Sequence, residues 1–327
     1  MRAWRVHELG EPGKALQLEQ LPDPRPEPGQ LVVRVRAAAA NFPDVLLCRG
    51  EYQVKPPLPF TPGIELCGEV VGVGGGANGF AVGDRVIGSP DLPTGAFGDM
   101  TLMTAARTFA APPALDDAEA AAFYIGYQTG WFGLHRRAAL QPGETLLVHA
   151  AAGGVGSAAV QLGKAAGATV IGVTGGPQKA EVARALGADL VVDRLTEDFV
   201  AVVKEATGGR GADVVYDPVG GEAYARSTKC VAFEGRILVV GFASGDVPTP
   251  GLNHALIKNY SIVGLHWGLY NQKDPAAIGQ CHDDLTALTE QGLVKPLVGE
   301  RLGMEQVADG VQRLADGATV GRLVFEL

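Results

Sequence analysis

A glycine-rich segment between a strand-like run and a helix-like run has the spacing that best fits a chemical task. Thr145–His149 is apolar, Ala150–Gly156 reads Ala-Ala-Ala-Gly-Gly-Val-Gly, and Gly156–Ala166 has helical composition. Glycines permit a sharp turn and let backbone N–H groups approach a pyrophosphate at the positive end of a helix. A further strand-like run at Thr169–Thr174 completes the context of a dinucleotide site. The alternative is a tight turn that binds nothing. We expect the phosphate-binding residues to be Ala152, Gly153, Gly154 and Val155.

The end of the second strand bears on which dinucleotide binds. It reads Val173-Thr-Gly-Gly176 and has no Asp or Glu, which an NAD site usually places about 20 residues beyond the glycine motif. The strand instead ends in small uncharged residues that include Gly175. Lys179 follows them, and Arg194 comes after the next strand, so that this end would accept a 2′-phosphate. The alternative for both cations is a solvated side chain. The pattern favours NADPH over NADH.

The composition is that of a globular protein with a hydrophobic core. Of the 327 residues, 46% are hydrophobic and 19% are charged, and the length suggests two domains. The formal net charge of -9 argues against duplex nucleic acid or an anionic membrane as the main partner. We therefore expect a small-molecule partner.

Cysteine usage and the N-terminus bear on the cellular compartment. The chain has no Cys-x-x-Cys pair, and its cysteines are scattered at Cys48, Cys67, Cys230 and Cys281. This spacing gives neither a zinc ribbon nor a disulfide framework, and it suits a reducing compartment. The first residues lack a signal peptide's apolar run, and the most apolar window, Leu146–Val173, is too polar for a membrane span. We expect a cytoplasmic protein in which Cys48 and Cys67 are inert core residues.

The first third of the chain predicts a β-rich domain with many reversals. Glycine and proline turns separate its strand candidates, which are Arg2–His7, Leu31–Ala37, Glu65–Val73 and Arg85–Gly88. The character changes near Asp116, where two aspartates favour the N-terminus of a helix over Ala118–Leu134.

From Glu144 onward, strand and helix patterns alternate. The expected strands are Thr145–His149, Thr169–Thr174, Leu190–Val192, Asp213–Tyr216 and Arg236–Val240, and the expected helices are Gly156–Ala166, Gln178–Leu186 and Asp198–Thr207. Repeated βα units with apolar strands imply a parallel sheet covered on both faces. The tail predicts a helix over Ala276–Gln291 and a last strand, Arg322–Phe325, that returns to the first domain.

Several short motifs follow one another in a recognisable order. They are Asn41–Asp44, Arg49–Tyr52, Pro59–Glu65, Gly83–Val86, Gly95–Gly98, Leu147–Gly156, Asp217–Gly220 and Val240–Gly241. The ordered set resembles the zinc-independent quinone oxidoreductase (zeta-crystallin-like) branch of the medium-chain dehydrogenase/reductase superfamily. The resemblance implies a GroES-like β-rich domain from residues 1–121 and 268–327, and a doubly wound Rossmann domain from residues 122–267. It also implies a cofactor in the cleft and a homodimer formed through the Rossmann domain.

The metal positions of the superfamily test this branch assignment. Zinc-containing relatives bind a catalytic zinc through Cys, His and Cys, and the matching positions here are Asn41, Ile64 and Ile125. Isoleucine cannot coordinate zinc, asparagine is a poor ligand, and Glu65 alone would not hold the ion. The chain also lacks a four-cysteine lobe. We therefore expect no metal and no metal-assisted alcohol dehydrogenase chemistry.

Without a metal, hydride transfer from NADPH to a conjugated acceptor is the plainest chemistry, and a quinone fits it. The resemblance implies that Asn41 holds the nicotinamide ribose or faces the substrate, and that Thr129 lies beside the nicotinamide. It places the remaining ring contacts at Gly241, Phe242, Ala243, Leu265 and His266. Related enoyl reductases use a tyrosine near Tyr52 as proton donor, and the alternative for Tyr52 is a packed loop residue.

Two other functions stay open at this point. An enal, enone or enoyl-thioester reductase would keep the same fold and cofactor. A non-catalytic NADPH-binding protein would keep the cofactor but have a structural or regulatory role, as some family members do. His149 is interpreted as a strand-end histidine and not as a catalytic base.

Overall fold

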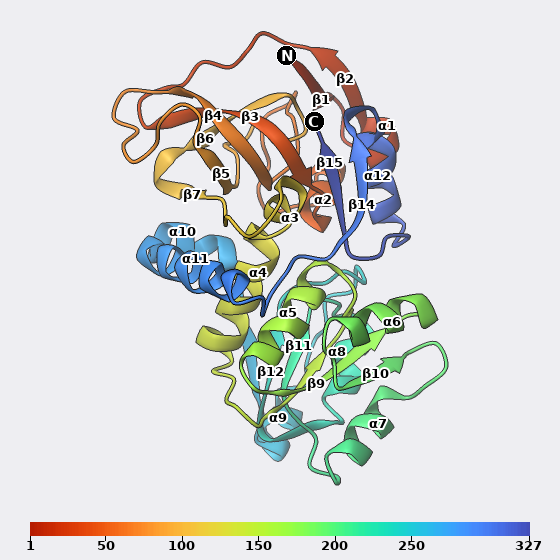
Figure 1. The fold of residues 1–327 in the computed structure, drawn as a ribbon. Coiled ribbons are helices and arrows are strands. Elements are labelled where there is room, and N and C mark those ends of the chain that lie inside the picture. The colour runs from red at the N-terminus through yellow and green to blue at the C-terminus, as the bar shows by residue number, and fades with distance from the viewer. The chain divides into compact units, whose positions relative to one another are not determined.

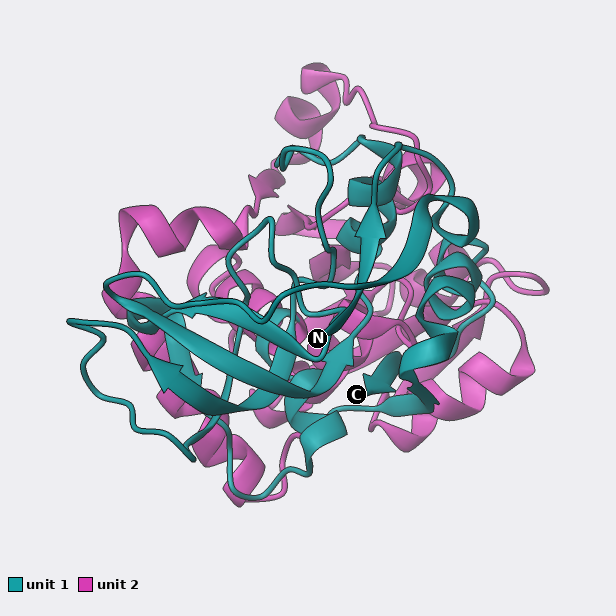
Figure 2. Ribbon diagram, turned by 90° about the horizontal axis from the view of Figure 1, so that it is seen from above, with its two compact units in different colours: residues 1–125, 295–327 teal, residues 126–294 magenta.

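The computed structural model describes residues 1–327, which form two compact units (Figure 1, Figure 2). The first unit comprises residues 1–125 and 295–327, and the second comprises residues 126–294. Residues 268–294, which the sequence analysis places with the β-rich domain, lie in the second unit. Contacts within that unit hold them there: Arg136 forms an ion pair with Asp274 at 2.7 Å, and the rings of Phe132 and Tyr270 lie 4.2 Å apart.

The first unit is rich in strands, as predicted. These are β1 (Arg2–Val6), β2 (Leu16–Gln20), β3 (Gln30–Ala39), β4 (Leu66–Val73), β5 (Arg85–Gly88), β6 (Met100–Thr104), β7 (Thr108–Ala110), β14 (Val298–Gly303) and β15 (Arg322–Glu326). Its helices are α1 (Pro12–Ala15), α2 (Phe42–Arg49), α3 (Asp117–Ala121) and α12 (Val307–Ala315), with 3-10 turns η1 (Ala105–Arg107) and η4 (Met304–Gln306). One sheet has the order β14-β15-β3-β4-β5-β7 with β6 paired to β3, and a second sheet pairs β1 with β2.

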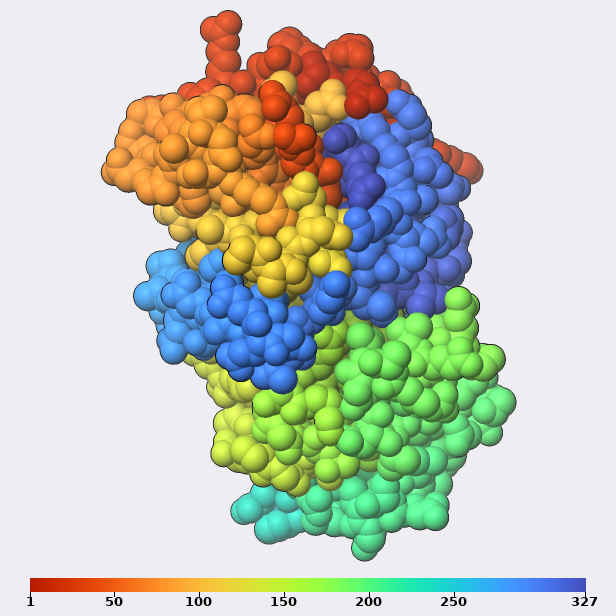
Figure 3. Space-filling view, in the orientation of Figure 1, coloured from red at the N-terminus to blue at the C-terminus, as the bar shows by residue number.

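The last strand returns to the N-terminal part of the chain, as the sequence predicts. β15 runs antiparallel to β3, with Val324 opposite Ala39, and parallel to β14. In the space-filling view its dark blue atoms lie between the lighter blue of β14 and the red to orange N-terminal residues (Figure 3). Val324 and Phe325 are fully buried, and the Phe325 ring meets the edge of Phe97 at 5.3 Å. Burial of these apolar side chains stabilises the strand in its place.

The second unit alternates strands and helices. Its strands are β8 (Thr145–Val148), β9 (Thr169–Thr174), β10 (Leu190–Asp193), β11 (Ala212–Asp217), β12 (Val231–Val239) and β13 (Ser261–Gly264). Its helices are α5 (Gly154–Ala165), α6 (Pro177–Ala185), α7 (Phe199–Ala206), α8 (Gly221–Ser227), α9 (Leu252–Lys258), η3 (Trp267–Leu269), α10 (Tyr270–Lys273) and α11 (Pro275–Glu290). The sheet order is β10-β9-β8-β11-β12-β13, and every pair is parallel.

The central strands of this sheet are buried on both faces. Successive side chains of a strand point to opposite faces, and Leu146, Leu147 and Val148 are all fully buried. Helices therefore cover both faces of the parallel sheet, which confirms the predicted doubly wound arrangement. None of the helices combines the length and the apolar character needed to span a membrane.

The helix predicted over Ala118–Leu134 is divided in the structure. Asp116 caps the start of α3 by accepting the Glu119 N–H at 2.8 Å, as expected. α3 ends at Ala121, α4 (Tyr124–Trp131) begins anew, and the π-helical turn η2 (Phe132–Arg137) follows. The N–H of Ile125 donates to the carboxylate of Glu65 at 2.7 Å. A partner 60 residues away in the sequence therefore accepts one of the unsatisfied N–H groups at the start of α4.

A buried carboxylate holds the start of α2. Asp44 accepts the backbone N–H of Asn41 at 2.8 Å through Oδ2 and the N–H of Gly63 at 3.0 Å through Oδ1. Its side chain has no exposed surface, and burial raises the pKa of Asp44 to about 7. Asp44 therefore fixes the backbone at Asn41 and joins α2 to the segment before β4.

Asp44→Asn is expected to lower the free energy of unfolding by about 1–3 kcal/mol at pH 5, because an amide nitrogen cannot accept one of the two backbone N–H groups. The loss should be smaller at pH 8. The folded-state pKa of Asp44 is about 7 against an ordinary 3.8. Its favourable contribution is therefore complete below pH 3.8 and is lost as the pH rises towards 7.

Urea unfolding of the wild type and the Asp44→Asn variant at pH 5 and pH 8 measures this difference. Asp309→Asn, at an exposed position in the first turn of α12, is the matched control and should change little at either pH. An Asp44→Asn loss that is the same at both pH values would contradict the titration of Asp44 in this window.

Candidate functional site

The glycine-rich turn follows the carboxyl end of β8 and leads directly into α5. Ala150 has a positive φ of 50°, and its carbonyl accepts the Gly153 N–H at 2.8 Å. A Cβ on Gly156 would lie only 2.1 Å from the Ala150 carbonyl oxygen, so this position requires glycine. Gly153 is the N-cap of α5 and supplies no side-chain acceptor. The first N–H groups of this twelve-residue helix are therefore available to an anion.

The four predicted phosphate-binding residues lie together in this turn. Gly153, Gly154 and Val155 are partly exposed, whereas the Ala152 side chain is buried. Exposed backbone at a helix N-terminus can approach a pyrophosphate closely. The arrangement fits the predicted role.

At the end of β9, Arg194 lies against Gly175. A Cβ on Gly175 would be 3.2 to 3.5 Å from the guanidinium atoms of Arg194, and the Arg194 N–H donates to the Thr174 carbonyl at 2.9 Å. The guanidinium is exposed and forms no ion pair within the chain. Lys179 lies in the first turn of α6, which begins just after Gly176. The structure thus brings the three predicted 2′-phosphate residues to one end of β9.

Sequence reasoning missed a carboxylate at the same place. Asp193 ends β10 opposite Thr174 in the sheet register, and its Oδ1 accepts the N–H groups of Gly176 at 2.8 Å and Leu195 at 3.1 Å. These two N–H groups hold the pKa of Asp193 below its ordinary value. The only sequence signal was its position directly before Arg194. A carboxylate and a guanidinium are therefore neighbours in the chain beside the three predicted 2′-phosphate residues.

The predicted nicotinamide contacts follow the carboxyl ends of two adjacent strands. Gly241, Phe242 and Ala243 come after β12, and Leu265 and His266 come after β13. The Leu265 N–H donates to the Val239 carbonyl at 3.0 Å, which ties the two strand ends together. Carboxyl ends of parallel strands share one edge, so these residues and the turn after β8 lie at the same edge of the sheet.

Thr129 is a buried residue of α4, next to a contact between that helix and the segment after β13. It lies in α4 and is 8% exposed. The adjacent Gln128 accepts the Trp267 indole N–H through Oε1 at 3.0 Å. This contact joins α4 to the chain directly after His266.

In the first unit, Asn41 belongs to a buried polar cluster. Its amide donates to Glu65 at 2.9 Å and accepts from Arg322 at 2.9 Å, and Arg322 is also ion-paired with Glu65. Burial raises the pKa of Glu65, which the Arg322 guanidinium opposes. Sequence reasoning missed Arg322, because it lies 257 residues from Glu65 and no local pattern marks it.

Tyr52 lies outside this cluster, just beyond α2. Its ring is partly buried against the hydrophobic core of the first unit, and its N–H donates to the Leu46 carbonyl at 3.3 Å. Burial, with a contribution from Asp44, raises the pKa of the Tyr52 phenol. This packing fits the alternative that Tyr52 is a packed loop residue. The raised pKa also keeps the phenol protonated, as a proton donor requires.

The positions aligned with the zinc ligands of the superfamily do not fit zinc. Asn41 and Ile125 both contact Glu65, through an amide and a backbone N–H. The guanidinium of Arg322 takes up the neighbouring polar positions, and a cation there disfavours a second one. No group of three or more His, Cys, Asp or Glu side chains comes together in the chain. A metal centre at this place has no donor set.

Other reactive side chains are structural. His149 is buried, contacts Ser227 Oγ at 2.7 Å through Nε2 and lies edge-on to Phe199, and burial lowers its pKa to about 4. Burial raises the pKa of Cys48 and of Cys67 to about 12 each. These three side chains are therefore poor candidates for a base or a nucleophile.

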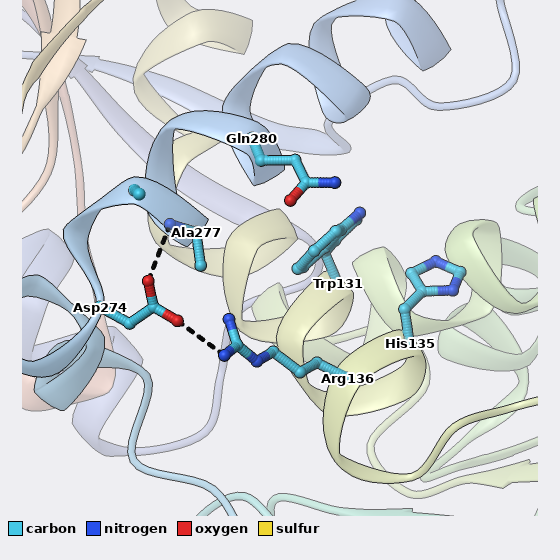
Figure 4. A pocket seen from close by; sticks show the side chains of 7 residues that line it. Trp131, His135, Arg136, Asp274, Ala277 and Gln280 are labelled. Carbon is cyan, nitrogen blue, oxygen red and sulfur yellow. Dashed lines mark hydrogen bonds and ion pairs between the residues drawn. The ribbon is translucent and has the colours of Figure 1, made fainter.

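A surface hollow of about 500 Å³ lies elsewhere in the second unit (Figure 4). The labelled side chains come from α4, η2 and the start of α11, and the ion pair of Arg136 with Asp274 forms part of the wall. Its lining residues are Trp131, His135, Arg136, Asp274, Ala276, Ala277 and Gln280. None of the predicted site residues is among them.

Comparison with known families matches both units. The alcohol dehydrogenase GroES-like domain family matches residues 27–113, and the zinc-binding dehydrogenase family matches residues 154–281. These matches confirm the predicted combination of a GroES-like domain with a Rossmann-type domain.

Individual proteins are similar over nearly the whole chain. A quinone oxidoreductase-like protein 2 homolog of Nematostella vectensis is 37% identical over 298 residues, which cover 90% of this chain and 81% of the relative. The solved quinone oxidoreductase of Escherichia coli, complexed with NADPH, is 30% identical with a TM-score of 0.93 over 100% of both chains. That of Pseudomonas syringae is 31% identical with a TM-score of 0.92 over 100% of this chain and 99% of the other. The chain therefore belongs to the zinc-independent quinone oxidoreductase branch of the medium-chain dehydrogenase/reductase superfamily, and it is an oxidoreductase.

Proposed function

We propose that this chain is an NADPH-dependent reductase that transfers hydride to a quinone. The observation that carries the proposal is the uncapped start of α5 beside Gly175 and Arg194, which together match a dinucleotide with a 2′-phosphate. The Escherichia coli protein of the same fold, complexed with NADPH, supports the choice of cofactor. NADPH supplies the hydride when bound, and the chain supplies orientation, exclusion of water and hydrogen bonds.

Different residues bind the phosphate groups and the nicotinamide end of the cofactor. N–H groups at Gly154 and Val155, at the start of α5, bind the pyrophosphate, and Lys179 and Arg194 bind the 2′-phosphate. The residues after β12 and β13, with Thr129, line the nicotinamide ring. Hydride addition leaves negative charge on the quinone oxygen, and we propose that Tyr52 donates the proton that completes the hydroquinone. Asn41 contributes a hydrogen bond whose direction is considered below.

Turnover with a panel of acceptors tests this function. The purified chain is expected to oxidise NADPH with simple quinones faster than with enones or enals, and a chelator should leave the rate unchanged because no donor set for zinc is present. Faster reduction of enones would favour the alternative reductase. Tight NADPH binding with no acceptor reduced would favour a non-catalytic binding protein, and chelator-sensitive activity would contradict the branch assignment.

Arg194→Ala is expected to raise the Kd of NADPH by about 10- to 100-fold, because a charge-assisted contact to the 2′-phosphate is lost. The Kd of NADH should change less than about twofold, since that cofactor has no 2′-phosphate. Binding is measured by the fluorescence of the reduced nicotinamide. Arg184→Ala removes the same charge from an exposed position in the last turn of α6 and is the control. Equal weakening of NADPH and NADH would remove Arg194 from the 2′-phosphate site.

We also propose that the protein is a homodimer formed through the second unit. β13 is an edge strand of the parallel sheet, and α9 (Figure 1) buries none of its residues. Leu252, Leu256 and Ile257 on α9 are each about three-quarters exposed. An unpaired strand edge beside exposed apolar side chains is typical of a protein interface. A second copy is the partner that the family resemblance favours.

Ile257→Glu is expected to convert the dimer to a monomer, because a carboxylate would be buried at the interface without a partner. Sedimentation or size-exclusion with light scattering measures the mass. Val82→Glu, at an apolar position of the first unit that is 66% exposed, should leave the mass unchanged. A monomeric wild type would contradict the proposed assembly.

The cytoplasmic location expected from the scattered cysteines stays a separate prediction.

A further inference from the structure

The polar cluster of the first unit is almost entirely buried. Glu65 is fully buried, and Asn41 and Arg322 are each 5% exposed. Arg322 donates to Asn41 Oδ1 at 2.9 Å through Nη1 and to Glu65 Oε2 through Nη2. Glu65 also accepts the Ile125 N–H at 2.7 Å through Oε1. Charges in such surroundings act strongly on a neighbouring dipole, because little water screens them.

Every hydrogen of the Asn41 amide is already used. Nδ2 donates one hydrogen bond to the Ala39 carbonyl at 3.1 Å and the other to Glu65 Oε2 at 2.9 Å. Oδ1 accepts one hydrogen bond, from Arg322, and an amide oxygen can accept two. The only unused hydrogen-bonding capacity of the side chain is therefore one lone pair on Oδ1.

The two charges also decide which way round the amide lies. If the amide were reversed, Nδ2 would face the guanidinium donors of Arg322, and Oδ1 would face the Glu65 carboxylate and the Ala39 carbonyl. All three contacts would become repulsive. The backbone is fixed as well, because the Asn41 N–H donates to buried Asp44 at 2.8 Å. The direction of the amide is thus set by the ion pair together with the Ala39 carbonyl.

We infer that Arg322 and Glu65 are positioning residues that restrict Asn41 to the role of a hydrogen-bond acceptor in the reaction. The group that it recognises is therefore a hydroxyl. Two sources carry one: the nicotinamide ribose of the bound cofactor, and the hydroxyl that forms when the acceptor is reduced. This inference rests on the proposed function, and it adds that Asn41 does not donate to a carbonyl oxygen of the substrate.

The test removes the ion pair without leaving a charge behind. Arg322→Met alone leaves Glu65 buried and unpaired, which destabilises the fold. The double variant Arg322→Met with Glu65→Gln carries no buried charge and keeps an acceptor for the Ile125 N–H, so its stability in urea should lie near that of the wild type. The new amide can present oxygen or nitrogen to Asn41, so both charged determinants of its direction are removed and only the Ala39 carbonyl still favours it. Arg322→Lys keeps the positive charge and should retain most of the wild-type behaviour.

Binding and turnover distinguish the two sources of the hydroxyl. If the ribose is the donor, the double variant should raise the Kd of NADPH about tenfold and leave the Kd of adenosine 2′,5′-bisphosphate, which lacks that ribose, unchanged. If the reduced acceptor is the donor, the NADPH Kd should stay constant and kcat/KM for the quinone should fall about tenfold.

A folded double variant that matches the wild type in both measurements overturns the inference, as does a folded Arg322→Lys variant that is as impaired as the double variant. Equal weakening of NADPH and of adenosine 2′,5′-bisphosphate also overturns it, because the effect is then general. The binding measurements need no turnover. A wild type that binds NADPH but reduces no quinone would therefore refute the proposed function alone.

Discussion

A carboxylate without water must find donors inside the protein, and Glu65 is the carboxylate that organises the first unit. Its three partners come from distant parts of the chain: the N-cap of α2, the backbone at the start of α4 and the first residue of β15. Removing one partner from a buried pair typically costs about 3–5 kcal/mol. The arrangement of these three segments around Glu65 is therefore strongly specified, although the pair itself need not add stability over an apolar core.

The family resemblance matches the zinc ligands of zinc-containing relatives to Asn41, Ile64 and Ile125, and two of these positions belong to the same cluster. Asn41 and Ile125 contact Glu65 through an amide and a backbone N–H. A fixed guanidinium then supplies the positive charge that a buried carboxylate requires. The ion pair neutralises Glu65 locally, so the chemistry of this site depends on hydrogen-bond direction and on the cofactor.

In the second unit, the constraint is the direction of the strands. All six run parallel, so their carboxyl ends share one edge, and segments as far apart as Ala150 and His266 reach it. At one end of that edge, Asp193 and Arg194 place opposite charges beside Gly175 and Gly176. The carboxylate is held by two backbone N–H groups, whereas the guanidinium has no ion-pair partner in the chain. A 2′-phosphate at this place would meet a cation that forms no ion pair within the chain.

The sequence alone determined the alternation of strands and helices in the second unit, the β-rich first third and the glycine turn after β8. These features depend on local composition and short spacings, which a single chain displays directly. Tertiary contacts decided which unit contains residues 268–294, since the Arg136–Asp274 ion pair lies within the second unit. Tertiary structure also decided that the helix predicted over Ala118–Leu134 is divided, and Glu65 contacts the backbone of Ile125 at the start of its second part. Asp193 and Arg322 were likewise visible only once strands far apart in sequence had paired. Pairing of distant strands brings such residues together without leaving any local pattern, because register and burial are properties of the folded chain.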